Sequence, residues 1–159
     1  MSDVFNLLDG VLDGEEEKPG YRNRRTQVGA ALGAELLGAT IYETPPGEKL
    51  WPYHWELGCE ELLVVVSGTP TLRTPEGERT LAVGDVVAFP EGEAGAHQLR
   101  NDSDAPFRVL ISSTKSGVYV AGYPDSHKLL VDAPAHGLRK MLRDAPELDY
   151  WDEESEATR

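Results

Sequence analysis

The segment that decides the fold is Tyr53-His54-Trp55-Glu56-Leu57-Gly58-Cys59-Glu60-Glu61. Side chains alternate along a β-strand, so His54 and Glu56, which are two residues apart, would point to one face. Gly58 allows a tight turn that would fold Glu61 back beside them, at the start of the apolar run 62–66. Imidazole and carboxylate groups that converge in this way are typical of a divalent-metal site.

A second histidine, His97, follows a segment with comparable turn chemistry. That segment begins at Gly84, continues through the apolar residues 86–89 and turns at Pro90 and Gly92. We therefore predict that four side chains from two distant segments meet at one metal ion: His54, Glu56, Glu61 and His97.

The composition fits one globular domain, because 40% of the 159 residues are hydrophobic and 27% are charged. No apolar run approaches the roughly 20 residues of a membrane span, and the first residues lack the pattern of a secretory signal. The net charge of −13 argues against nucleic acid or an anionic membrane as a partner. A single cysteine, Cys59, cannot form an internal disulfide, so we expect a cytoplasmic protein.

Short strand-like runs separated by glycine and proline predict an all-β sandwich or barrel. We divide the chain into an N-terminal arm (1–20), a β-barrel domain (21–131) and a C-terminal extension (132–159). The expected strands of the barrel cover residues 25–31, 35–43, 50–56, 61–67, 71–74, 79–82, 86–89, 97–101 and 107–112.

The two ends of the chain are less regular. The apolar start of the arm would be a helical turn or a docking arm, and the acidic run 15–17 a solvated loop. Nearby arginines would pair with the surrounding acids or, as an alternative, with a phosphate or carboxylate of a substrate: Arg22, Arg24 and Arg25. Residues 118–131 would add one or two peripheral strands, and the acidic run 152–156 would be frayed.

Both histidine segments follow glycine-framed motifs. The first reads Gly47, six residues, His54-x-Glu56, four residues, Glu61, six residues and Gly68. The second contains Gly84, Pro90, Gly92, His97 and Asn101, with four residues between Gly92 and His97. The pair resembles the two motifs of the cupin superfamily, which implies a double-stranded β-helix (jelly-roll) barrel.

The resemblance implies a metal held at the positions of His54, Glu56, Glu61 and His97. The first motif of the family has a second histidine where this chain has Glu56, so the predicted ligands are two imidazoles and two carboxylates. Such a set would hold Mn²⁺, Fe²⁺, Zn²⁺ or Ni²⁺. Two carboxylates would also reduce the strength of the ion as a Lewis acid.

Each ligand has an alternative interpretation. Both histidines could simply be hydrogen-bonded in the mouth of the barrel. Glu56 could swing out and leave a three-ligand site, and Glu60 would replace Glu61 if the strand register slipped by one residue. We expect Asn101 to form turn hydrogen bonds.

Other residues near or beyond the motifs have structural interpretations. Three aromatic residues that alternate with His54 would share the strand face opposite the metal: Trp51, Tyr53 and Trp55. We expect Cys59 to be an incidental thiol, and His127 and His136 to lie on the surface.

Two functional hypotheses follow. The first is a metal-dependent cupin that binds or converts a small molecule, with dioxygenase-like or sugar-isomerase-like chemistry and with catalytic residues that the sequence leaves unknown. The second is a non-catalytic cupin that serves as a ligand-binding or interaction module, with a structural metal or none. Because cupin barrels are commonly dimers, the resemblance also implies a homodimer.

Overall fold

The structure, a computed structural model, describes residues 4–152 and residue 154. Antiparallel β-strands dominate it, which confirms the all-β prediction, and α1 (Val28–Ala31) is the one α-helix of this described part. The strands are β1 (Gly14–Lys18), β2 (Tyr21–Thr26), β3 (Leu37–Thr44), β4 (Trp55–Leu57), β5 (Glu61–Ser67), β6 (Thr71–Thr74), β7 (Gly77–Thr80), β8 (Val86–Phe89), β9 (Gln98–Arg100), β10 (Phe107–Thr114), β11 (Tyr119–Tyr123), β12 (Lys128–Ala133) and β13 (Leu138–Arg143).

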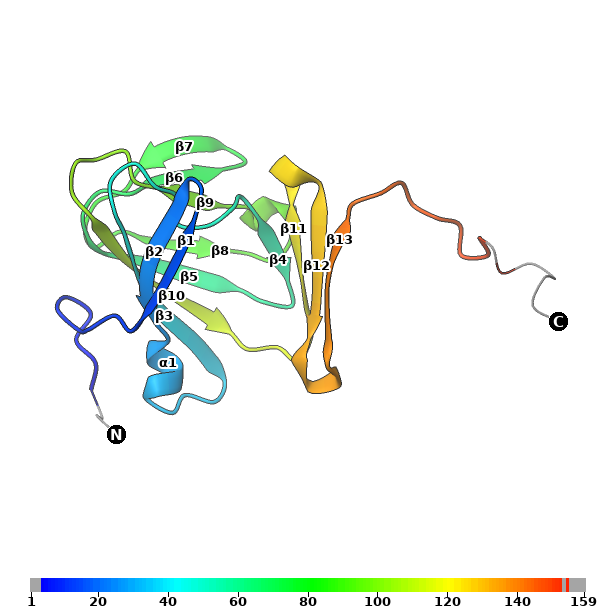
Figure 1. Cartoon of the computed structure of the whole chain (residues 1–159), viewed down its shortest axis with the longest axis horizontal. Helices are drawn as coiled ribbons and strands as arrows, with labels where there is room; N and C mark the ends of the chain where they lie inside the picture. The colour runs from blue at the N-terminus through cyan, green and yellow to red at the C-terminus, as the bar shows by residue number, and fades with distance from the viewer. Residues whose placement is uncertain (1–3, 153, 155–159) are drawn as a thin grey trace.

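The strands form three sheets. The largest has the order β1-β2-β3-β10-β5-β8, and a three-stranded sheet has the order β7-β6-β9. A third sheet, β13-β12-β11-β4, stands at one end of the barrel, where Figure 1 shows β11, β12 and β13 side by side. None of the helices in the described ranges has the length and hydropathy that a membrane crossing requires.

The barrel core is built by alternation along the central strands. On β5, Leu63 and Val65 are buried, whereas Leu62 is 43% exposed. Glu61 shares the inward face with Leu63 and Val65, because it is two residues before Leu63. A carboxylate is thereby placed at the end of the hydrophobic core, which is formed by Leu50, Leu63, Val65, Leu72, Leu81, Phe89, Leu99, Phe107, Val109 and Ile111.

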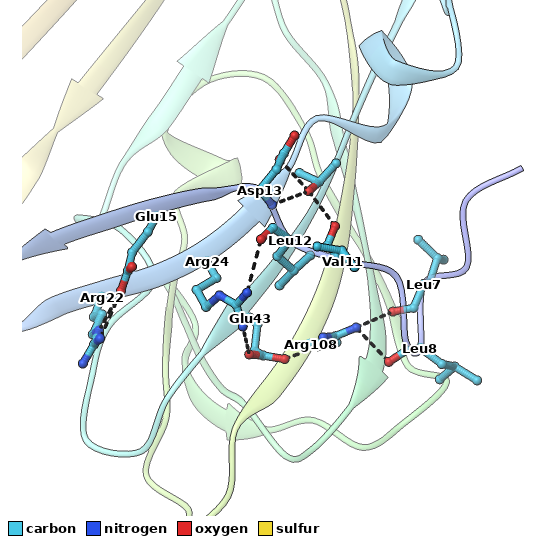
Figure 2. A network of polar contacts seen from close by, with 11 residues as sticks. Leu7, Leu8, Val11, Leu12, Asp13, Glu15, Arg22, Arg24, Glu43 and Arg108 are labelled. Carbon is cyan, nitrogen blue, oxygen red and sulfur yellow. Dashed lines mark hydrogen bonds and ion pairs between the residues drawn. The ribbon is translucent and has the colours of Figure 1, made fainter. Parts of the chain in front are cut away.

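The N-terminal arm docks on the barrel, and this outcome agrees with one of its two expected forms (Figure 2). The Nη1 of Arg108 on β10 donates hydrogen bonds to the carbonyl oxygens of Leu7 and Leu8, at 3.3 and 2.7 Å. Its Nε donates to Glu43 at 2.7 Å. Leu12 is 5% exposed and belongs to a second apolar cluster with Val28 and Ile41.

The prediction of a solvated loop over the acidic run of the arm is wrong. These residues form β1, which pairs in antiparallel register with β2. Cross-strand ion pairs explain the difference, because Arg22 lies 3.0 Å from Glu15, and Arg25 lies 2.6 Å from Glu16. Both arginines therefore pair with acids, as predicted.

Two strand predictions also need correction. The segment expected as a strand over residues 25–31 ends its strand at Thr26 and continues as α1. The predicted strand over 50–56 is regular only in β4, from Trp55 onward. Pro52 explains this interruption, since proline has no backbone N–H to donate to a ladder.

The C-terminal region is more regular than predicted. Residues 118–131 contain β11 and most of β12, as expected for peripheral strands, but the boundary drawn after residue 131 falls inside β12. The extension then contributes β13, which pairs with β12 along its whole length. Residues 153 and 155–159 of the acidic tail lie outside the described residues.

Candidate metal centre

Backbone pairing brings the two predicted histidines together. His54 immediately precedes β4 and His97 immediately precedes β9, and the two residues form an isolated antiparallel bridge. Their imidazole centroids lie 4.8 Å apart. The two motif segments, separated by more than forty positions in the chain, therefore meet at one point, as predicted from their sequences.

The Nδ1 atom of each histidine ring forms a hydrogen bond with a backbone carbonyl group. Nδ1 of His54 lies 2.9 Å from the carbonyl oxygen of Pro52, and Nδ1 of His97 lies 2.9 Å from that of Gly95. Because a carbonyl oxygen can only accept a hydrogen bond, each Nδ1 must carry the proton. In the neutral ring Nε2 then has no hydrogen, and its lone pair is available. This tautomer is the one in which Nε2 can bind a metal.

His97 Nε2 is a buried polar atom without a hydrogen-bond partner among the described residues. The side chain of His97 is only 2% exposed, and Oε2 of Glu61 lies 3.4 Å from Nε2. When Glu61 is ionised, its carboxylate oxygen and the imidazole nitrogen without a hydrogen are both acceptors, so they gain nothing from each other directly. A cation between them would satisfy both atoms.

Three of the four predicted ligands form one group. One ligand atom from each of His54, Glu61 and His97 lies within 4.8 Å of the others, so this group could hold a metal ion. Glu56 is adjacent rather than central: its Oε1 lies 3.9 Å from Nε2 of His54. Glu56 belongs to a second group, with Cys59 and Glu61, whose ligand atoms also lie within 4.8 Å of one another.

The carboxylate register is the one predicted. Glu61 points inward with a side chain that is 16% exposed, whereas its neighbour Glu60 is exposed. Gly58 adopts a φ of 78°, a left-handed conformation that glycine tolerates best, and so makes the turn before β5. The alternative in which Glu60 replaces Glu61 is therefore wrong for this structure.

Burial suppresses charge on the site residues. It lowers the pKa of His97 to about 3, an effect to which His54 adds, and it lowers the pKa of His54. Burial and then the charge of Glu56 raise the pKa of Glu61 to about 8. Neutral imidazoles are the form that binds metal, and a dication would favour the ionised form of Glu61.

Aromatic rings enclose the histidines. The rings of Phe89 and His97 stack with centroids 3.7 Å apart, and Tyr123 stacks on His54 at 5.8 Å. Trp51 contacts both histidine rings edge-on, at 6.0 and 5.7 Å. The prediction that Trp51 faces away from the metal is therefore wrong. It assumed one continuous strand, and the chain is irregular around Pro52.

A cavity of about 370 Å³ opens over this group. Besides the candidate ligands, it is lined by side chains that the sequence did not point to, including Tyr42, Tyr123 and Arg139. Tyr123 and Arg139 lie on β11 and β13, in the region interpreted as periphery and tail. For Tyr123 the one visible signal is its spacing of four residues from Tyr119, which by itself is too weak to place it beside the histidines. No local pattern marks Arg139.

The other singled-out residues have structural roles or are exposed. Asn101 is buried, and its Nδ2 donates to the carbonyl oxygens of Thr44 and Ala105, both at 2.9 Å, in agreement with its predicted turn role. His127 and His136 are exposed, as predicted. Burial raises the pKa of the Cys59 thiol to about 12, with Glu56 adding to the effect.

Comparison with known proteins agrees with the geometry. Residues 40–113 match the family model of the cupin domain. A proposed sugar phosphate isomerase from Acidithiobacillus ferrooxidans is 27% identical, with a TM-score of 0.77 over 85% of this chain and 88% of the other. A sugar phosphate isomerase of the cupin superfamily from Silicibacter pomeroyi is 26% identical, with a TM-score of 0.73 over 80% and 81% of the two chains.

A more distant structure shares the fold alone. It is a polyketide cyclase from Streptomyces resistomycificus, 20% identical, with a TM-score of 0.51 over 58% of this chain and 64% of the other. No curated protein sequence matches the chain. The strand arrangement, the two motifs and the family match together identify residues 40–113 of this chain as a cupin domain.

Proposed function

We propose that this protein is a metal-dependent cupin that binds a divalent transition metal through His54, Glu61 and His97, with Glu56 as the fourth ligand. The observation that carries the proposal is the buried Nε2 of His97, which has no hydrogen-bond partner among the described residues. Leaving such an atom unpaired costs about 1–3 kcal/mol, and a metal bond would offset this cost.

Two imidazoles with one or two carboxylates suit Mn²⁺, Fe²⁺, Zn²⁺ or Ni²⁺. When bound, such an ion would polarise a carbonyl group or orient neighbouring oxygen atoms of a small molecule. A cavity of about 370 Å³ is within the range of small-molecule sites. The ligand that we propose is therefore a small oxygen-rich molecule.

Among the enzymatic possibilities, we propose sugar-isomerase-like chemistry first and dioxygenase-like chemistry second. Two structures that align with most of this chain are described as sugar phosphate isomerases, one of them as a proposal. A sugar isomerase that works through an enediol moves a proton between neighbouring carbon atoms with the help of a base. Glu56, which lies beside the three-ligand group rather than within it, is placed to accept and return that proton if it does not bind the metal.

The test is elemental analysis by plasma mass spectrometry on untagged protein, compared with His54→Ala and Glu56→Ala. His127→Ala is the matched control, since His127 is an exposed histidine far along the chain. About one equivalent of metal in the wild type and the control, lost in both site variants, would support the four-ligand site. Loss only in His54→Ala would leave Glu56 as the base.

No metal in any sample after reconstitution would contradict the proposal and leave the second hypothesis, a ligand-binding or interaction module.

We also propose a cytoplasmic homodimer. Exposed apolar side chains on β5 and β8, Leu62 at 43% and Val86 at 57% exposure, are compatible with a subunit contact. Sedimentation that shows a monomer at all concentrations would contradict the dimer.

A further inference from the structure

The C-terminal sheet places the guanidinium group of an arginine in the cavity over the candidate metal centre. Arg139, on β13, lines the same cavity as His54, Glu56 and Glu61. Among the described residues that line this cavity, Arg139 alone carries a permanent positive charge. It lies beyond the family match, which covers residues 40–113, so it belongs to the extension of this chain rather than to the matched domain.

The strand register explains why Arg139 reaches the cavity. In an antiparallel pair, residues directly opposite each other point to the same face of the sheet. Tyr119 pairs with Asp132, and Asp132 pairs with Arg139, so the three form one row across the sheet. Glu56 pairs with Ala121, two residues after Tyr119, and thus shares their face.

Arg139 keeps donors available for a ligand. One nitrogen, Nη1, donates a short hydrogen bond to the buried carboxylate of Asp132. The guanidinium also interacts with the side chain of Tyr119. Because a guanidinium has five N–H donors in a fixed fork, these two partners leave further donors for a ligand. The side chain is 67% exposed, in contrast to 5% for Asp132.

Among the described residues of the cavity lining, Arg139 is the group that suits an anion, with Asp132 already offsetting part of its charge. Glu16, a further acid in the lining, is already paired with Arg25 at 2.6 Å. Glu56 and Glu61 lie with the histidines at the candidate metal centre. A ligand whose charged end lies against β13 would meet the guanidinium, while its other oxygens lie toward the histidines.

We propose that Arg139 binds the anionic group, a carboxylate or a phosphate, of the small molecule that occupies the metal centre. This inference rests on the proposed function and deepens it by assigning a substrate class and a specificity residue. The planar fork of arginine matches both groups through two parallel hydrogen bonds.

A purely structural role must be separated from this one. Arg139 could serve only to neutralise the buried Asp132, and Arg139→Gln would then destabilise the hairpin without affecting a ligand. The double variant Asp132→Asn/Arg139→Gln removes both charges and so leaves no unpaired buried carboxylate. Lys140→Gln is the charge control, because Lys140 is next on the same strand and alternates to the opposite face.

The experiment is isothermal titration of the full chain with inorganic phosphate, and separately with acetate, in the millimolar range and without metal. We expect Arg139→Gln and the double variant to weaken binding of at least one anion about tenfold or more. Lys140→Gln should bind as the wild type does. The preferred anion distinguishes a phosphate ester from a carboxylate as the natural group.

A parallel Mn²⁺ titration keeps the two proposals separable. Arg139→Gln should retain the Mn²⁺ affinity of the wild type, because Arg139 is not a proposed ligand. If the wild type binds neither anion, or if the double variant binds both as well as the wild type does, Arg139 is not the anion site. Absence of Mn²⁺ binding in every protein would instead contradict the proposed function.

Discussion

The backbone amide of His54 donates to the carbonyl oxygen of His97 at 3.2 Å, and the amide of His97 donates to the carbonyl oxygen of His54 at 2.8 Å. This reciprocal pair holds two segments from distant parts of the chain in register. It depends on main-chain atoms, so it survives the replacement of either imidazole. The position of the centre is thus set by the fold, and its chemistry by the side chains.

Metal binding should therefore be separable from folding at His54. A ligand that binds only the folded state at about 100 times its dissociation constant stabilises that state by about 2.7 kcal/mol. We expect Mn²⁺ to raise the thermal midpoint of the wild type and to leave that of His54→Ala unchanged, with circular dichroism the same for both. An equal shift in the variant would show that the ion binds elsewhere.

Glu61 should make the metal-free protein less stable as the pH rises from about 4.5 to about 8. Its pKa is raised from 4.5 to about 8 by burial and then by Glu56, so the folded chain holds this proton more tightly than the unfolded chain. The free energy of unfolding then falls as the pH rises from the unfolded pKa to the folded pKa, in total by on the order of 5 kcal/mol.

Urea unfolding of metal-free protein at about pH 5 and about pH 8.5 measures the contribution of Glu61 to the free energy of unfolding. Glu61→Gln has no proton to lose, so its stability relative to the wild type should increase with pH. Glu60→Gln, an exposed neighbour, should follow the wild type. Parallel pH profiles for the wild type and Glu61→Gln would show that Glu61 is not desolvated.

The strands that could be predicted have strong local signals. β5 occupies its predicted limits, because an apolar run is bounded by turn residues on both sides. The ligand group was also predictable in large part, since both motifs follow the family frame, with one extra residue before His54 and two extra residues between Gly92 and His97. The irregular backbone around Pro52 could not be predicted. The sequence there alternates as a strand would, and the effect of the proline depends on the neighbouring strands.

The cavity wall could not be predicted for a different reason. Arg139 reaches the centre through three successive strand pairings, β4 with β11, β11 with β12 and β12 with β13. Each register depends on long-range contacts, and a shift by one residue would point the side chain to the opposite face. The residues next to Arg139 in the sequence do not indicate these three strand pairings.

Cys59 should be an unreactive thiol. Burial, followed by the charge of Glu56, raises its pKa to about 12, so about one molecule in 10⁴ carries the thiolate at about pH 8. We expect native protein to react with a disulfide reagent at least about tenfold more slowly than unfolded protein. Glu56→Gln should speed the native reaction and Glu60→Gln should not, whereas equal rates for native and unfolded protein would contradict the burial.

Gly122 should be required for the packing of Trp55. The two residues are cross-strand partners, and a Cβ at Gly122 would lie 2.1 Å from the Trp55 ring. Gly122→Ala should cost about 1–3 kcal/mol in urea unfolding and shift the tryptophan fluorescence. Gly117→Ala is the control, because a Cβ there meets nothing within 4 Å, and it should change stability by less than about 1 kcal/mol. Equal stabilities for the two variants would refute the packing role.

Arg108 should hold the N-terminal arm on the barrel. Its side chain is 15% exposed and bridges Glu43 to the carbonyl oxygens of Leu7 and Leu8. Arg108→Ala should lower the free energy of unfolding by about 2–4 kcal/mol, because charged hydrogen bonds are lost and the largely buried Glu43 keeps only its longer ion pair with Arg24, at 3.8 Å.

Limited proteolysis provides the second readout, since release of the arm should expose its first residues to cleavage before the barrel unfolds. Arg22→Ala is the matched control: its ion pair with Glu15 lies at the surface, with both side chains about half exposed. That variant should stay within about 0.5 kcal/mol of the wild type and keep its cleavage pattern. If Arg108→Ala behaves like Arg22→Ala in both measurements, the arm is held by the apolar contacts of Leu12 rather than by the arginine.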